Sequence, residues 1–186
     1  MKNPQSKTNG SWFGNSIKVV ASALALLLLG AGSAARADDD WGHAPALPAS
    51  LQVPAGNTLE FLAYGVGVQI YTWSAALSTW GTSTPHAVLF DDDGVAAIHF
   101  AGPSWQNDDG SKVVGMKLAA VTVDTNAIPW LLLKGTPTTA PGIFADVTYV
   151  QRLYTRGGLA PATPGTVDGQ QVLVPYSAEY LFYHAE

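Results

Sequence analysis

The feature that most constrains this fold is a series of short apolar and aromatic runs separated by glycine, proline and Asp-Gly turns. After residue 37 no stretch shows a sustained 3.6-residue apolar period, so amphipathic helices are not expected. Val, Thr, Tyr, Trp and Phe recur in segments of strand length. The sequence therefore predicts an all-β domain: an antiparallel β-sandwich or a partly closed β-barrel of about eight or more strands.

Several strands can be placed from their flanking turns. Residues 87–100 predict a hairpin around Asp91-Asp92-Asp93-Gly94, because Asp-Gly tolerates positive φ. A calcium loop is disfavoured there, since no later Glu completes an EF-hand pattern. In residues 58–73 the apolar parity changes, which predicts a bulge or turn at Gly65 and Gly67. Further strands are expected at 112–124, 128–133 (buried on both faces), 144–155 and 172–184.

The N-terminus has the pattern of a secretory signal peptide over residues 1–37. Basic residues precede an apolar run from Val19 to Leu29, and Ala35-Arg36-Ala37 ends the segment. We expect cleavage after Ala37 and a periplasmic or secreted protein with no membrane span after cleavage, because the apolar run is only about half the length of a spanning helix. The expected domain is 38–186, with an irregular lead-in at 38–50.

Charge and cysteine content restrict the partners. All 14 Asp and Glu follow Ala37, but only five of the nine Lys and Arg do, which leaves this part with a net charge of −9. Such a surface repels nucleic acid and anionic lipid. The chain has no cysteine, and a domain of this size can bury a core without disulfides.

Two candidate ligand-binding residues are aromatic. If Ile98 and Phe100 face the core, strand alternation turns His99 to the opposite side, where its imidazole could line a pocket; it could equally be half exposed or hydrogen-bonded to the next strand. Trp105 follows a Gly-Pro turn, from which its indole could cover a flat apolar ligand or plug the end of the fold.

Four further candidates are polar. Asp109 and Lys112 follow Trp105 in the same segment, although Asp109-Gly110 is also a typical turn. Gln151 and Arg152 lie on a predicted strand, where Arg152 could bind an anion or form a structural salt bridge with Asp146 or a neighbouring strand, the structural pairing being our default interpretation.

No catalytic set or metal site is recognisable. The four histidines, His43, His86, His99 and His184, lack the i, i+2 or i, i+4 spacing of a metal site, and no serine lies in a Gly-x-Ser-x-Gly elbow. A dinucleotide fingerprint starting at Gly65-x-Gly67 fails, because its third glycine would fall at Ile70. We therefore predict no cofactor and no metal, and we lean against an enzyme.

The chain carries a series of short motifs in a fixed order: Gly67-Val68-Gln69-Ile70-Tyr71; His99-x-Ala101-Gly102-Pro103-x-Trp105 with Asp109-Gly110-Ser111; Ile128-Pro129-Trp130-Leu131-Leu132-Leu133; Val147-Thr148-Tyr149-Val150-Gln151-Arg152; Gly157-Gly158-x-Ala160-Pro161; and Val174-Pro175-Tyr176-Ser177-Ala178-x-Tyr180. In these motifs it resembles the secreted family of bacteria and fungi catalogued as domain of unknown function 3455. The resemblance implies no mechanism. It implies a cysteine pair in many members, which this chain lacks. Some fungal relatives are labelled malate dehydrogenase, a reading that the failed fingerprint does not support.

These observations favour an exported all-β protein that binds an unknown small molecule or a component of the cell envelope. One alternative is an extracytoplasmic, hydrolase-like enzyme that uses His99 with Asp109 or Asp146. Another is a structural or stress-related envelope protein without a small ligand.

Overall fold

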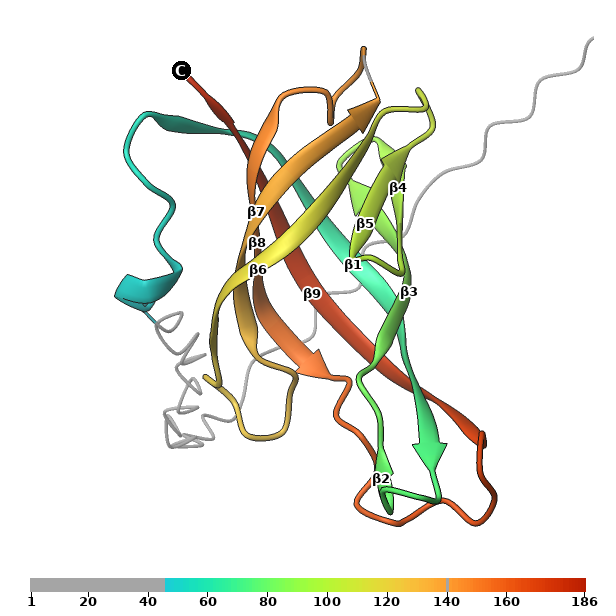
Figure 1. Ribbon diagram of the computed structural model, residues 1–186. Helices are drawn as coiled ribbons and strands as arrows, with labels where there is room; N and C mark the ends of the chain where they lie inside the picture. Colours follow the sequence, from blue (N-terminus) through green and yellow to red (C-terminus); the bar gives the residue numbers. More distant parts are fainter. Residues whose placement is uncertain (1–45, 140) are drawn as a thin grey trace, which may run out of the picture. The chain divides into compact units, whose positions relative to one another are not determined.

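Nine β-strands form one antiparallel sheet that closes into a ring (Figure 1). This computed structural model describes residues 46–139 and 141–186, which belong to a unit spanning His43–Glu186. The predicted signal peptide, its cleavage site and the first part of the expected lead-in lie outside the described residues. A short 3-10 helix, η1 (Ala49–Leu51), occupies the end of that lead-in.

Strand pairing follows chain order almost throughout. The strands are β1 (Asn57–Ser74), β2 (Thr79–Trp80), β3 (Thr84–Asp91), β4 (Gly94–Phe100), β5 (Ser104–Asn107), β6 (Lys112–Val121), β7 (Trp130–Thr139), β8 (Val147–Gly157) and β9 (Gln171–Ala185). Strand β2 pairs only with the end of β1, and β9 pairs with β1 along most of their lengths to close the ring. The all-β prediction is confirmed, and the architecture is an up-and-down barrel of eight strands with β2 as an extension.

The core fills the inside of this barrel. Alternate residues of each strand point inward, and the aromatic rings of Phe61, Phe144 and Phe182 pack together with centroid separations of 4.7–6.0 Å. Buried side chains from every strand except β2 complete this cluster, including Ala63, Leu89, Ala97, Trp105, Val113, Leu133, Val150, Ala178 and Tyr180.

A second apolar cluster lies on the outer face of the barrel. Helix η1 places Leu51 against Trp130 and Leu132 of β7 and Leu153 of β8. Strand β7 therefore has buried residues on both faces, as its continuous apolar run predicts.

The predicted position of the bulge in β1 is wrong. The strand is continuous, and its irregularity lies between Leu59 and Phe61 rather than at Gly65 and Gly67. Both glycines stay on the inward-facing side of the strand, and Val66 is exposed. A Cβ on Gly65 would lie 2.6 Å from Tyr180 Cε2, so glycine is needed there to admit the tyrosine ring.

The Asp-rich segment at 91–94 is the turn of the β3–β4 hairpin. Asp91 pairs with Gly94, and Asp91 Oδ1 accepts hydrogen bonds from the backbone N–H groups of Asp93 and Gly94. The carboxylate thus stabilises the turn, in agreement with the hairpin prediction.

Candidate functional site

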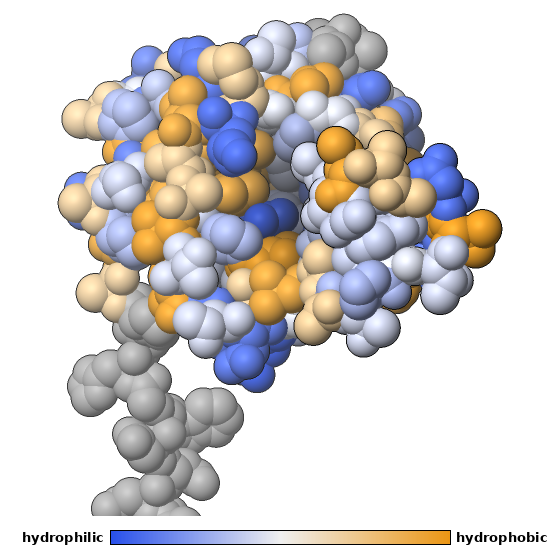
Figure 2. Space-filling view, turned by 60° about the horizontal axis from the view of Figure 1, so that its bottom comes forward, coloured by the Kyte–Doolittle hydropathy of each residue, from blue (hydrophilic) through white to orange (hydrophobic). Residues whose placement is uncertain are grey.

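One end of the barrel is hollow. A cavity of about 480 Å³ opens between the strands there. The surface is hollowed at this end, with hydrophilic residues lying among hydrophobic ones (Figure 2). We call this cavity the barrel pocket and define it by six side chains that line it: Gln69, His99, Trp105, Lys117, Arg152 and Tyr180.

His99 and Trp105 stack inside the barrel pocket. They are partners across the β4–β5 pairing, and their rings lie 4.4 Å apart at an angle of 4°. Tyr180 of β9 packs edge-on against both rings. Gly115 of β6 makes room for the indole, because a Cβ there would lie 2.9 Å from Trp105 Cζ3. Both candidate aromatic residues therefore line the same hollow.

His99 is held in one neutral form. Its Nδ1 lies 2.8 Å from the backbone oxygen of Ser104, and since a carbonyl only accepts, Nδ1 carries the proton. Burial lowers the pKa of His99 from 6.5 to about 3; the Ser104 hydrogen bond opposes this shift, and the positive charge of Arg152 adds to it. At neutral pH the imidazole is uncharged, and Nε2 keeps a lone pair.

Arg152 projects inward from β8 between β7 and β9. Its Nε and Nη2 donate to the backbone oxygen of Pro129 at 3.3 and 2.8 Å. This carbonyl, rather than the carboxylate of Asp146, holds the guanidinium. Within 46–139 and 141–186 no Asp or Glu lines the barrel pocket, so no carboxylate in its lining neutralises the charge of Arg152.

Two buried donors of the barrel pocket are unsatisfied. Trp105 Nε1 and Gln69 Nε2 have no hydrogen-bond partner among the described residues, although each side chain is about 1% exposed. The Gln69 amide lies close enough to the Tyr176 hydroxyl to lower its pKa, but Nε2 does not reach hydrogen-bonding geometry. Most buried polar groups in proteins are paired, so these two side chains in the lining of one cavity are exceptions.

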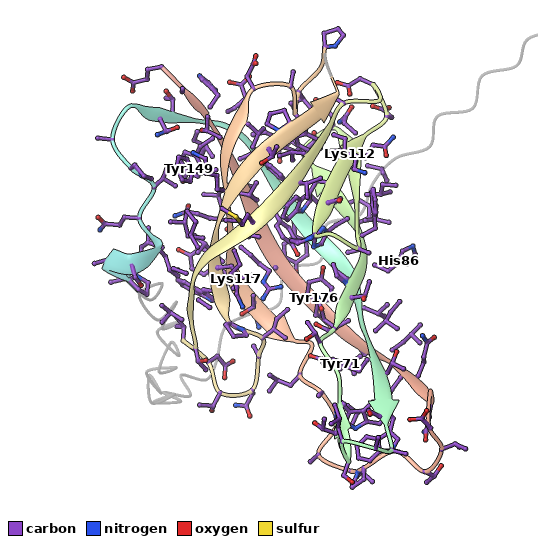
Figure 3. All side chains as sticks on the ribbon, viewed as in Figure 1. Tyr71, His86, Lys112, Lys117, Tyr149 and Tyr176 are labelled. Carbon is purple, nitrogen blue, oxygen red and sulfur yellow. The ribbon has the colours of Figure 1, made fainter. Side chains whose placement is uncertain are left out.

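Two buried tyrosines lie together inside the barrel, and one of them, Tyr180, lines the barrel pocket. The hydroxyls of Tyr176 and Tyr180 lie 3.0 Å apart and share a hydrogen bond. Burial raises the pKa of both, most strongly for Tyr180, so each hydroxyl is protonated at neutral pH. Tyr176 and Lys117 lie in the same half of the barrel, whereas Lys112 lies toward its other end (Figure 3).

Asp109 and Lys112, two of the other sequence candidates, lie away from the barrel pocket. Asp109 Oδ1 accepts from the Ser111 N–H at 2.7 Å and Oδ2 from the Ile143 N–H at 3.0 Å; hydrogen bonds from Ser111 are the main cause that holds its pKa below the usual value. The Lys112 ammonium lies 5.0 Å from the centroid of the Phe100 ring. Neither residue lines the barrel pocket.

Gln151 and Asp146 also lie outside the barrel pocket. Gln151 points to the outer face, where Nε2 donates to the Leu51 backbone oxygen at 2.6 Å and Oε1 accepts from the Tyr183 hydroxyl at 2.8 Å. Asp146 lines a smaller pocket of about 330 Å³ that also contains Glu60 and His184. The pairs His99–Asp109 and His99–Asp146 are therefore not brought together in the barrel pocket.

Sequence reasoning missed Gln69 and Lys117. Gln69 stands between Val68 and Ile70, and its inward position follows only if the β1 irregularity is placed at Leu59 rather than at the glycines. A bulge between Lys117 and Ala119 lets both Lys117 and Ala120 reach the pocket from β6. A polar residue inside an apolar strand was the available signal for both.

No group of three or more His, Cys, Asp or Glu that could hold a metal ion occurs within 46–139 and 141–186. The described part of the chain also contains no helix of the length and hydrophobicity needed to span a bilayer.

Fold and site together define an eight-stranded up-and-down β-barrel with one hollow end, lined by stacked aromatic rings and two cations. The profile of a family described as "Protein of unknown function (DUF3455)" matches residues 93–184. The match confirms the resemblance drawn from the motifs, and the segment from β4 to β9 belongs to this family; the motif at 67–71 lies before the matched range. No curated protein and no solved structure matches the chain.

Proposed function

We propose that this protein is an exported, non-enzymatic β-barrel module that binds a small organic molecule in the barrel pocket. The observation that carries the proposal is the open cavity of about 480 Å³, which is lined by stacked rings and two cations and which includes Trp105, a residue whose buried Nε1–H has no partner. A barrel end that served only as scaffold would be expected to be filled by side chains rather than to keep an open cavity beside an unpaired donor.

The size and lining of the barrel pocket support a small-molecule ligand. Its volume of about 480 Å³ lies within the usual range for ligand sites. Pro85, Leu131 and Leu133 give it apolar walls, and a few polar groups lie among them. Eight-stranded barrels are wide enough to hold one small ligand.

Binding is favoured over hydrolytic catalysis by the state of His99. A general base needs a pKa near the working pH and a partner that orients it. Burial keeps the pKa of His99 far below neutrality, and the carboxylates of Asp109 and Asp146 line other parts of the molecule. The third reading, an envelope protein without a ligand, predicts no saturable binding at all.

Filling the mouth of the barrel pocket is expected to abolish binding. Ala120 lines the mouth, so Ala120→Trp places an indole where a ligand would enter. We expect N-phenyl-1-naphthylamine, a neutral fluorescent probe, to bind the unmodified protein saturably and at least tenfold more weakly to the variant, a loss of about 1.4 kcal/mol or more. Fluorescence titration measures both affinities.

The matched control is Leu118→Trp, because Leu118 lies on the same strand but is 49% exposed and does not line the barrel pocket. It is expected to keep the affinity of the unmodified protein. Equal binding by both variants would place the probe elsewhere, and no saturable binding by the unmodified protein would favour the ligand-free envelope reading.

A further inference from the structure

We propose that the ligand of the barrel pocket is an organic anion, with a carboxylate or similar acidic group on an apolar body. This inference rests on the proposed function and specifies the ligand class. It is carried by the juxtaposition of two cations and two unpartnered donors in a cavity whose lining contains no carboxylate.

Positive charge is concentrated in the lining of the barrel pocket. Five Lys and Arg lie in the described residues, and two of them, Lys117 and Arg152, line the barrel pocket. Three of the 14 Asp and Glu precede residue 46, and none of the eleven that follow lines this pocket. In a protein with an excess of acidic residues, such a separation produces a local positive potential that attracts anions.

Arg152 is held in place by neutral groups only within the pocket lining. The Pro129 carbonyl accepts from Nε and Nη2 and so fixes the guanidinium plane, and the Tyr180 hydroxyl lies beside the group. A carbonyl is a dipole and carries no counter-charge. The arginine is therefore oriented but not neutralised by the pocket lining, and an anion in the pocket would supply the missing charge.

The barrel pocket is rich in hydrogen-bond donors. The indole Nε1–H of Trp105 can only donate, and the free end of Gln69 is its NH₂ group, which also donates. Together with Arg152 and Lys117 they form a set of donors with no carboxylate among them. Acidic oxygens are the acceptors that satisfy several donors at once, whereas a hydroxyl or amine would leave most of them unpaired.

The shape of the cavity sets the rest of the molecule. The walls at Pro85, Leu131 and Leu133 are apolar, and the cavity of about 480 Å³ is much larger than an inorganic ion. An inorganic anion alone would leave these walls in contact with water, so an acid with an apolar body, such as an aromatic or short-chain acid, fits better.

The test compares two probes with the same aromatic skeleton. 1-Anilinonaphthalene-8-sulfonate carries a sulfonate that N-phenyl-1-naphthylamine lacks. We expect the anion to bind at least tenfold more tightly at low salt, and Arg152→Met to weaken binding of the anion at least tenfold more than binding of the neutral probe, so that the preference is lost. Fluorescence titration gives both affinities for each protein.

Two further variants keep the result interpretable. Lys117→Met, at an exposed position, is expected to weaken binding of the anionic probe more than binding of the neutral probe, and it gives this result even if Arg152→Met folds poorly. Arg156→Met is the matched control, because Arg156 lies on the same strand but is exposed outside the barrel pocket, and it should preserve the preference.

The outcomes separate the two proposals. Equal binding of both probes, or an anion preference that survives both Arg152→Met and Lys117→Met, would overturn the anion inference and leave the binding function intact. Failure of both probes to bind the unmodified protein would overturn the proposed function itself.

Discussion

Replacing Phe182 by alanine is expected to lower the free energy of unfolding by about 3–5 kcal/mol. Phe182 is fully buried at the centre of the barrel core. Its ring packs at 4.7 Å from Phe144, 5.6 Å from Phe61 and 5.8 Å from Trp105, measured between centroids. The variant loses these contacts and leaves a cavity that the closed sheet cannot readily collapse to fill.

Urea unfolding followed by circular dichroism measures this effect. Leu173→Ala is the matched control on the same strand, since Leu173 is 57% exposed, and it should change the free energy of unfolding by less than about 1 kcal/mol. A loss below about 1 kcal/mol for Phe182→Ala would mean that the aromatic cluster is not the core of the barrel.

Acidification is expected to destabilise the protein through His99. The pKa of its ring is about 6.5 in the unfolded chain and about 3 in the folded protein, so between these values only the unfolded chain binds the proton. The contribution of His99 is fully present above pH 6.5 and is lost as the pH falls toward 3. At about 1.4 kcal/mol per pH unit, it amounts to about 3 kcal/mol between pH 7 and pH 4.

Unfolding curves at pH 7 and pH 4 test this for the unmodified protein and His99→Phe. The variant is less stable at pH 7, because it loses the hydrogen bond to Ser104, but it should lose about 3 kcal/mol less on acidification. The difference between the two proteins separates His99 from the carboxylates, which titrate in both. His86→Asn, at an exposed histidine, should keep the original dependence. Identical pH dependence in His99→Phe would show that this imidazole is not buried in neutral form.

The sequence predicts the strands better than it predicts which faces are inside. The class follows from short runs and turn residues, and β8 and β9 begin and end within three residues of the expected bounds. The inward face is harder to predict because the interior is filled by large rings that face small residues. Gly65 leaves room for the Tyr180 ring and Gly115 for the Trp105 ring, whereas several large apolar residues of the same two strands, such as Val66 and Met116, are exposed.

In the candidate site, too, the sequence predicts local relations but not those that depend on closure of the sheet. His99 and Trp105 meet because β4 and β5 are joined by a tight turn, a local relation that the motif suggests. Arg152 reaches them only through closure of the sheet around β7, β8 and β9, which local pattern does not specify. Alternation separates Gln151 from Arg152, since neighbouring residues on a strand point to opposite faces.

The most direct test of the account is the indole N–H signal of Trp105 in a ¹H–¹⁵N spectrum recorded with and without 1-anilinonaphthalene-8-sulfonate. The signal is assigned by its loss in Trp105→Phe. Trp130, which is buried in the outer cluster with Leu51, serves as an internal reference. If the barrel pocket binds the probe, the Trp105 signal shifts as its free donor acquires an acceptor, and the Trp130 signal stays in place. An unmoved Trp105 signal at saturating probe would contradict a ligand site in this pocket.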